Sequence, residues 1–275
     1  MHPIQTMAAA IYLAAGVAAI LGLALPEPRI LRGARWGLAI GALVQTGAFA
    51  TLHRLDPPPS LTDFGQAVAV MAWLGVLFAL VLFARLRLPG FVPPIAFIAF
   101  LATFGTLLGP TEPATHTPLA TQAAARAAEQ ASGTILPHAH VLLASAGLAA
   151  LGLAALAGFF FLVEHRALKQ RRSVARRIPM PSLEALDRVN RVALVLGFPL
   201  LSLGVLTGAL WLDSRTGAFF GGSLHETWML IAWMIYLGLV ALRFGGRQGA
   251  RQAAASAVAG FAFLLFAVLG AGLVS

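Results

Sequence analysis

Residues 138–163 read HAHVLLASAGLAALGLAALAGFFFLV, and residues 164–177 continue as EHRALKQRRSVARR. The first stretch exceeds the roughly 20 predominantly apolar residues that a transmembrane helix needs to cross the hydrocarbon core. The second stretch is rich in Arg and Lys, which are enriched in the cytoplasmic loops of membrane proteins. We therefore predict that residues 138–163 form a transmembrane helix whose C-terminal end faces the cytoplasm.

The same alternation of apolar windows and basic stretches extends over the whole chain. Apolar windows occur at 7–25, 36–53, 64–84, 91–110, 138–163, 191–212, 226–243 and 253–273. Most of the 19 Lys and Arg residues lie in Arg29–Arg35, Arg85–Arg87, Arg166–Arg191 and Arg243–Arg251. Because these stretches follow alternate windows, we predict an all-α, polytopic membrane bundle of about eight helices with both termini outside. Residues 1–275 are expected to form one transmembrane domain.

Composition supports a membrane protein and argues against a nucleic-acid partner. The chain is 59% hydrophobic and only 11% charged, whereas soluble domains have about a quarter of their residues charged. The net charge of +9 is spread over loops that would lie beside the anionic lipids of the inner leaflet. The expected partner is therefore the lipid bilayer. The first six residues lack the basic region of a signal peptide, so we expect the first window to be retained.

Cysteine is absent, which excludes several kinds of chemistry. The chain cannot form a disulfide, use a catalytic thiolate or hold haem by a thioether. Any metal or haem iron would therefore depend on histidine as its strong ligand.

The topology divides the seven histidines unequally between the two sides. His165 would lie at an inner helix end and the other six on the outer side. His53 ends the second window, His140 opens the fifth and His225 opens the seventh. Ionisable groups near membrane depth are costly and are therefore candidates for function. Two interpretations remain open: hydrated residues at helix ends, or a shared metal or haem site.

Two features refine this group of histidines. His138 precedes His140 by two positions, or about 200° on a helix, so only one of them can face the bundle. His140 opens the apolar window and is the better candidate. Glu226, which follows His225, could orient that imidazole or cap the helix N-terminus, and the capping interpretation is preferred.

Aromatic residues surround the same outer loop. Trp211 and Trp228 flank residues 212–224, which include Phe219 and Phe220. They could form an ordinary aromatic belt at the membrane interface, or they could be the walls of a site for a flat apolar ligand.

Three further patterns give structural expectations. Ser182–Asn190 predicts a helix start that runs into the sixth window, and Pro199 should kink that helix. The Ala-rich stretch Thr121–Ser132 predicts a short surface helix over the outer face, although an inert connector is an equal alternative. Polar residues inside the windows are interpreted as packing contacts between helices; these are Gln45, Gln66, Ser145, Ser202 and Thr207.

Several of these segments resemble the cytochrome c assembly family (CcsA, CcmC, HemX and the YpjD-type inner-membrane proteins). The stretch His138–Lys169 is similar to a family helix that a histidine opens and a basic segment closes. HETWMLIAWMIY at 225–236 resembles the family's KETW helix, and Arg243–Arg251 resembles the basic turn after it. Residues Asp63–Trp73 are similar to an early segment of YpjD-type members.

The chain departs from the haem lyases of this family in two respects. Their outer loop is rich in tryptophan, whereas Thr216–Leu224 contains none. CcsA also has histidines near the positions of Ala241 and Val274, where this chain has none. The resemblance is therefore closest to the YpjD-type proteins and implies an assembly factor rather than a full haem lyase.

The resemblance implies a protein of the bacterial inner membrane that handles haem in cytochrome c biogenesis. His140 corresponds to the family's first outer haem-ligand position. Non-covalent haem would then be bound through iron by His140 and His225, with His53 as a further candidate. Trp211, Trp228, Phe219 and Phe220 would be its apolar walls. Other biogenesis or respiratory-complex membrane proteins would be partners.

Two alternatives to haem handling were weighed. The first is a cofactor-free scaffold or regulator, or an accessory subunit of a respiratory or assembly complex. The second is a transporter, which ranks last because Pro199 is the one clear break in the apolar windows and no buried acid is recognised in them.

Overall fold

The computed structural model describes residues 3–25, 27–52, 64–86, 88–108, 135–170, 181–246 and 248–274, and these contain helices but no strands. The long helices are α1 (Pro3–Ala24), α2 (Pro28–Leu52), α3 (Phe64–Arg85), α4 (Val92–Leu108), α6 (Ile135–Lys169), α7 (Leu183–Thr216), α8 (Leu224–Phe244) and α9 (Ala250–Val274), and a short 3-10 helix, η1 (Pro89–Phe91), precedes α4. Each predicted window coincides with one of the long helices. The all-α prediction is therefore confirmed.

Seven of these helices are long and apolar enough to cross a membrane, so the chain is a multi-pass membrane protein. The remaining helix, α2, starts with a basic stretch that contains Arg29, Arg32 and Arg35. That stretch lowers its mean hydropathy, and the passage of α2 through the membrane stays a prediction.

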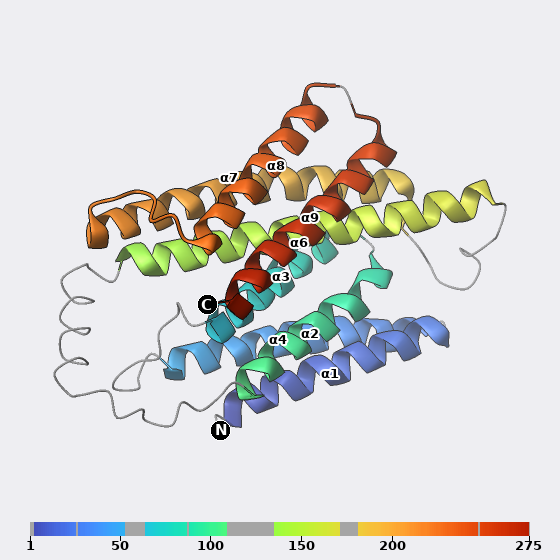
Figure 1. The fold of residues 1–275 in the computed structure, drawn as a ribbon. Helices are drawn as coiled ribbons and strands as arrows, with labels where there is room; N and C mark the ends of the chain where they lie inside the picture. Colours follow the sequence, from blue (N-terminus) through green and yellow to red (C-terminus); the bar gives the residue numbers. More distant parts are fainter. Residues whose placement is uncertain are drawn as a thin grey trace.

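Successive long helices run in opposite directions through the bundle (Figure 1). The helix ends that carry the basic stretches therefore gather on one side, which we call the basic end: the starts of α2, α7 and α9 and the ends of α3, α6 and α8. The opposite side, where α6 and α8 begin and α7 ends, is called the histidine end. Helix α1 begins and α9 ends on this same side (Figure 1), as an even number of spans requires. Its location outside the membrane stays a prediction.

The helices form two groups that meet at α6. Helices α1 to α4 pack against one another, α6 packs against α7 and α9, and α8 packs mainly against α9. Contacts between α3 and α6 join the two groups. Helix α6 is consequently the most buried of the candidate spans. Its neighbours on several sides determine which way its side chains point.

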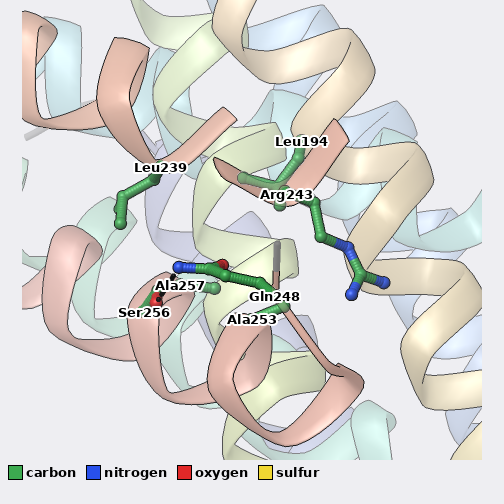
Figure 2. A pocket seen from close by; sticks show the side chains of 7 residues that line it. All are labelled: Leu194, Leu239, Arg243, Gln248, Ala253, Ser256 and Ala257. Atoms are coloured by element: carbon green, nitrogen blue, oxygen red, sulfur yellow. Dashed lines mark hydrogen bonds between the residues drawn. The ribbon is translucent and has the colours of Figure 1, made fainter. Parts of the chain in front are cut away.

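Helix α8 is tied to its neighbours at a few points. At the basic end, Arg243 near its C-terminus donates to Asp187 in the second turn of α7, and Asp187 also pairs with Arg191. The Arg243 side chain is only 6% exposed and borders a cavity of about 10 Å³, which is room for about one water molecule. Figure 2 shows this cavity, with Gln248 donating to Ser256 across it at 3.3 Å.

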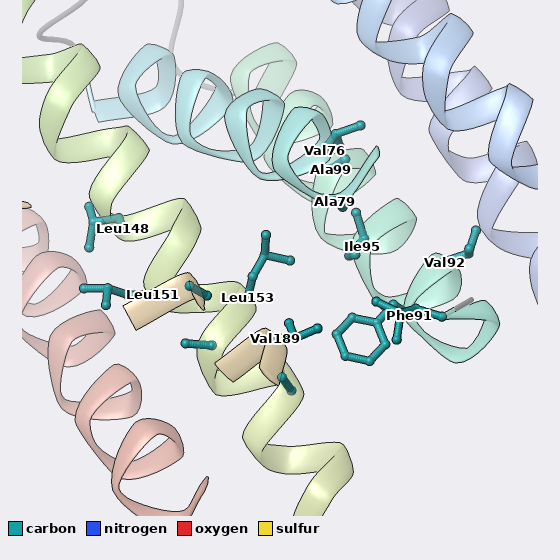
Figure 3. Packing of buried hydrophobic residues seen from close by; sticks show 14 of the residues in the cluster. Val76, Ala79, Phe91, Val92, Ile95, Ala99, Leu148, Leu151, Leu153 and Val189 are labelled. Atoms are coloured by element: carbon teal, nitrogen blue, oxygen red, sulfur yellow. The ribbon is translucent and has the colours of Figure 1, made fainter. Parts of the chain in front are cut away.

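Close packing around α6 depends on residues without bulky side chains. A Cβ at Gly147 would lie 2.5 Å from the Leu201 nitrogen of α7, and one at Gly158 would lie 2.6 Å from the Ala254 oxygen of α9. Such close approach is favoured in membranes, where helix association depends on van der Waals packing. Figure 3 shows part of the apolar core, which includes Leu153 of α6 and Ile95 of α4.

Three of the five polar side chains predicted to pack between helices bond to another helix; these are Gln45, Ser145 and Ser202. Tyr12 donates to the Gln45 side-chain oxygen at 2.8 Å, and the Gln45 amide donates to the Ala69 carbonyl at 3.3 Å. The indole of Trp233 in α8 donates to the Ser202 hydroxyl of α7 at 2.9 Å. Thr207 differs, because its hydroxyl donates to carbonyls of its own helix. The bonds that join different helices fix the rotation of each helix relative to its neighbour.

Two predicted features fall on α7 and two on other parts of the chain. The expected helix start is confirmed, because Ser182 is the N-cap and accepts from the Ala185 nitrogen at 3.2 Å. Helix α7 continues through Pro199 as one helix, and a kink at this residue stays a prediction. His53 and the predicted surface helix Thr121–Ser132 lie outside the described residues.

Candidate functional site

His140, in the second turn of α6, has one ring nitrogen committed to the backbone of α7. Its Nδ1 lies 2.7 Å from the Gly204 carbonyl oxygen. A carbonyl can only accept, so Nδ1 must carry the hydrogen in this bond. In the neutral imidazole the lone pair is then on Nε2, which is the atom available for a metal ion.

A glycine pair on α7 makes room for this ring. A Cβ at Gly208 would lie 2.7 Å from His140 Nδ1, so the imidazole rests against bare backbone. A Cβ at Gly204 would lie 2.8 Å from the Ala144 Cα of α6. The two helices therefore approach closely at this point. The signal in the sequence is two glycines four residues apart on α7, which the sequence analysis did not single out.

Trp211 follows Gly208 by about one turn of α7, and its ring lies next to the His140 ring. The two ring centroids are 6.4 Å apart and the rings are tilted by 32°. One turn later, the Arg215 guanidinium lies over the Trp211 ring at 5.6 Å from its centroid, in the range of a cation–π contact. Imidazole, indole and guanidinium thus form a column that leads from the bundle to the exposed end of α7.

His225 reaches the same region from the first turn of α8, where its side chain is exposed. Helices α6 and α8 do not pack along their lengths. The His140 and His225 imidazoles are nevertheless close enough to interact electrostatically. The structure therefore places the two histidines that the sequence analysis ranked first at the same end of the bundle.

The loop before α8 is closed by a capping arrangement. Ser223 is the N-cap and accepts from the Glu226 nitrogen at 3.2 Å, while Glu226 Oε2 accepts from the Gly221 nitrogen at 2.7 Å. Ser followed three residues later by Glu is the sequence pattern of a capping box. Gly222 between them has a φ of 74°, which favours glycine. The capping interpretation of Glu226 is thus confirmed.

The other predicted aromatic walls have different surroundings. Trp228 packs edge-on against Phe266 at 5.8 Å and contacts Phe263 at 6.0 Å, so it faces α9. Phe219 and Phe220 lie in the loop before α8 and are 62% and 48% exposed. Of these aromatic residues, Trp211 has the ring contact with a candidate ligand in the described part of the chain.

Within the described ranges, no group of three or more His, Asp or Glu residues could hold a metal ion. A pair of imidazoles does not complete the four-ligand shell that structural zinc requires. It does match the axial ligation of a planar iron cofactor, which needs one or two protein ligands.

Comparison with known proteins places the chain in a family. Residues 62–275 match the model of the family described as cytochrome c assembly protein. The chain is similar to "Cytochrome c biogenesis protein CcsA" of Prochlorococcus marinus strain MIT 9303, with 33% identity over 96 residues, which are 35% of this chain and 30% of that protein. The same-named protein of strain MIT 9215 is 26% identical over 156 residues, or 50% of each chain.

A similarly named protein of Microcystis aeruginosa strain NIES-843 is 32% identical over 90 residues, which are 33% of this chain and 27% of that protein. The matched segments thus span at most about half the length of these relatives. The family model, by contrast, extends over most of the chain, from residue 62 to its last residue. This chain belongs to the cytochrome c assembly protein family.

Proposed function

We propose that this protein handles haem in cytochrome c biogenesis and binds it non-covalently at the histidine end. His140 is the principal iron ligand, through Nε2, and His225 is the second candidate. The observation that carries the proposal is the 2.7 Å contact between His140 Nδ1 and the Gly204 carbonyl. Metal-binding histidines typically donate their other ring nitrogen to such a partner, which fixes the tautomer and the ring orientation.

The remaining residues suit a porphyrin in charge and shape. Trp211 supplies an apolar ring beside His140. Arg215 is exposed and lies over Trp211, so its guanidinium could pair with a propionate carboxylate of the haem. Haem is the cargo here: the protein's residues bind it, orient it and shield one face from water.

We assign a binding and presenting role rather than thioether formation. The loop Thr216–Leu224 lacks the tryptophans of the haem lyases, and its residues from Gly217 to Leu224 are exposed. Such a surface favours transfer of haem to a partner protein of the biogenesis machinery. We place the protein in the bacterial inner membrane, with the histidine end outside.

Absorbance spectroscopy tests the haem assignment directly. Protein purified from haem-replete cells should show a Soret band, and titration of haem into stripped protein should restore it with saturation near one haem per chain. Absence of a Soret band even after titration would exclude this function and leave the cofactor-free scaffold or regulator.

Reporter fusions test the orientation independently of haem. A fusion at Ser173 should report the cytoplasm, whereas fusions at Thr121 and Ser275 should report export, because Lys- and Arg-rich loops stay in the cytoplasm. The opposite result at any of the three positions would contradict the orientation.

A further inference from the structure

The basic end contains a cavity that the histidine site does not use. Its volume is about 560 Å³, and its lining residues are Leu162, His165, Arg166, Lys169, Gln170 and Arg251. The α6 members from Leu162 to Lys169 follow the spacing of one helix face, and Arg251 comes from the first turn of α9. Twenty-five residues of helix separate His165 from His140, which is roughly 37 Å at 1.5 Å per residue.

The charged side chains that line this cavity are all basic. Three of its lining residues, Arg166, Lys169 and Arg251, carry basic side chains. Among the described residues, no acid lines the cavity. The sequence also lacks acidic residues from Arg166 to Leu183 and from Thr227 to the C-terminus. The adjoining chain therefore offers no counter-ion.

The acids that come nearest in the sequence are occupied elsewhere or turned inward. Glu184 pairs with Arg188, and Asp187 pairs with Arg191 and Arg243. Glu164 is 7% exposed and lies on the buried face of α6 with Phe161 and Ala167. In the described part of the chain, the cations of the cavity form no ion pair, so they can attract an anion from outside.

Apolar residues continue this face toward the middle of the membrane. Leu162 contributes an apolar side chain to the cavity itself. Phe159 and Val163, at the same level of α6, are 52% and 37% exposed. Cations at a helix end with exposed apolar side chains one turn deeper match a ligand that has an anionic head and an apolar tail. Basic pockets between helices on the cytoplasmic side of membrane proteins bind anionic headgroups in this way.

We propose that this cavity binds the phosphate group of an anionic phospholipid of the cytoplasmic leaflet. Arg166 and Arg251 hold the phosphate from two helices, since the guanidinium fork matches phosphate oxygens, and Lys169 adds a third charge. The acyl chains lie along Phe159 and Val163. The bound lipid thereby links α6 to α9 at the basic end. This site is independent of haem binding at the histidine end.

Native mass spectrometry of the full-length protein in detergent tests the site. Phosphatidylglycerol, phosphatidylcholine and inorganic phosphate are added separately to wild type and to the triple variant Arg166→Gln/Lys169→Gln/Arg251→Gln. The control is Arg188→Gln, which removes an exposed charge at the same end but outside the cavity. Phosphatidylglycerol should bind wild type and the control alike. The triple variant should bind it about a hundredfold more weakly, because one basic residue at an anionic surface typically contributes about fivefold.

The lipid assignment has clear contrary outcomes. Equal binding of phosphatidylglycerol and phosphatidylcholine to wild type would overturn it, as would an unchanged affinity in the triple variant. Saturable binding of inorganic phosphate without binding of phosphatidylglycerol would show a site for a free anion instead. The thermal midpoint in phosphatidylcholine verifies that the variants are folded, and it should stay at the wild-type value because the substituted side chains are exposed.

Discussion

Helices α6 and α8 each carry one candidate haem ligand, but they hold it in different ways. Inside the structure, 56% of the apolar window of α6 is buried, against 11% for α8. His140 is half-buried and bonded to the α7 backbone, whereas His225 is exposed near the start of its helix. The comparison indicates that a preorganised ligand comes from the enclosed helix and an adjustable one from the peripheral helix.

The peripheral helix is secured at separate points along its length. Arg243 pairs with Asp187 at one end, Trp233 donates to Ser202 in the middle, and the Ser223–Glu226 cap closes the other end. Between these contacts, Met234 and Leu230 face outward and are 58% and 39% exposed. Changes at His140 should therefore affect haem binding more than equivalent changes on α8.

The largest effect is expected for His140→Ala. Loss of the principal iron ligand should abolish the Soret band of protein purified from haem-replete cells and lower haem affinity at least about 100-fold, since even the partners of metal ligands contribute 10- to 100-fold. Haem titration followed by absorbance measures the change. The control is His138→Ala, two positions away on α6, which should retain the band. Retention of the band in His140→Ala would transfer the ligand role to another residue.

Gly208→Val should cause the next largest loss of haem affinity, although it removes no ligand atom. Its Cβ would lie 2.7 Å from His140 Nδ1, so the imidazole must move and its bond to Gly204 must break. We expect haem affinity to fall about 10- to 100-fold, which is the usual cost of losing the partner of a metal-binding histidine.

A matched control separates this effect from the insertion of valine into a helix. Gly238→Val places the same side chain in α8, where nothing lies within 4 Å of the added Cβ. It should leave the haem affinity unchanged. Equal affinities in the two valine variants would show that the position of the His140 ring does not matter.

The difference between Gly208 and Gly238 shows which feature of the site could not be predicted from the sequence. Hydropathy located every long helix, and the alternation of basic loops placed His140 and His225 at the same end. The contact of Gly208 with His140 depends on the relative position of α6 and α7 along their shared interface. That position is set by packing at residues such as Gly147 and Leu201, which one apolar window cannot reveal.

Trp228 illustrates the same limit for helix rotation. The sequence places it one turn after His225 and near Trp211, so it was predicted as a wall of the same site. In the structure its ring packs against Phe263 and Phe266 of α9. The rotation of α8 is fixed by contacts far from this loop, including the Trp233–Ser202 bond. The sequence therefore did not reveal that the Trp228 ring packs against α9, and its role as a wall of the site stays a prediction.

His225→Ala is expected to have a smaller effect than either change around His140. The His225 side chain is exposed, and water or another group can replace an adjustable ligand at modest cost. We expect a shifted and weaker Soret band with haem affinity lowered about tenfold, or about 1.4 kcal/mol. Absorbance spectra of both oxidation states should show the change of axial ligand. A loss as complete as that of His140→Ala would contradict the unequal roles of the two helices.

Glu226→Gln should have the smallest effect, because Glu226 supports His225 from the cap of α8 and is not itself a candidate ligand. The Glu226 carboxylate accepts a hydrogen bond of 2.7 Å from the Gly221 nitrogen. It lies in the first turn of the helix, where negative charge is favoured. Glutamine keeps the shape but loses the charge, so the free energy of unfolding should fall by about 0.5–1 kcal/mol. Haem affinity should fall about two- to threefold, because the start of α8 positions His225 less firmly. Glu184→Gln is the control, since Glu184 occupies the first turn of α7 behind another serine cap, Ser182. That variant should lose similar stability but no haem affinity, and an equal loss of affinity in both would exclude a specific role for the α8 cap.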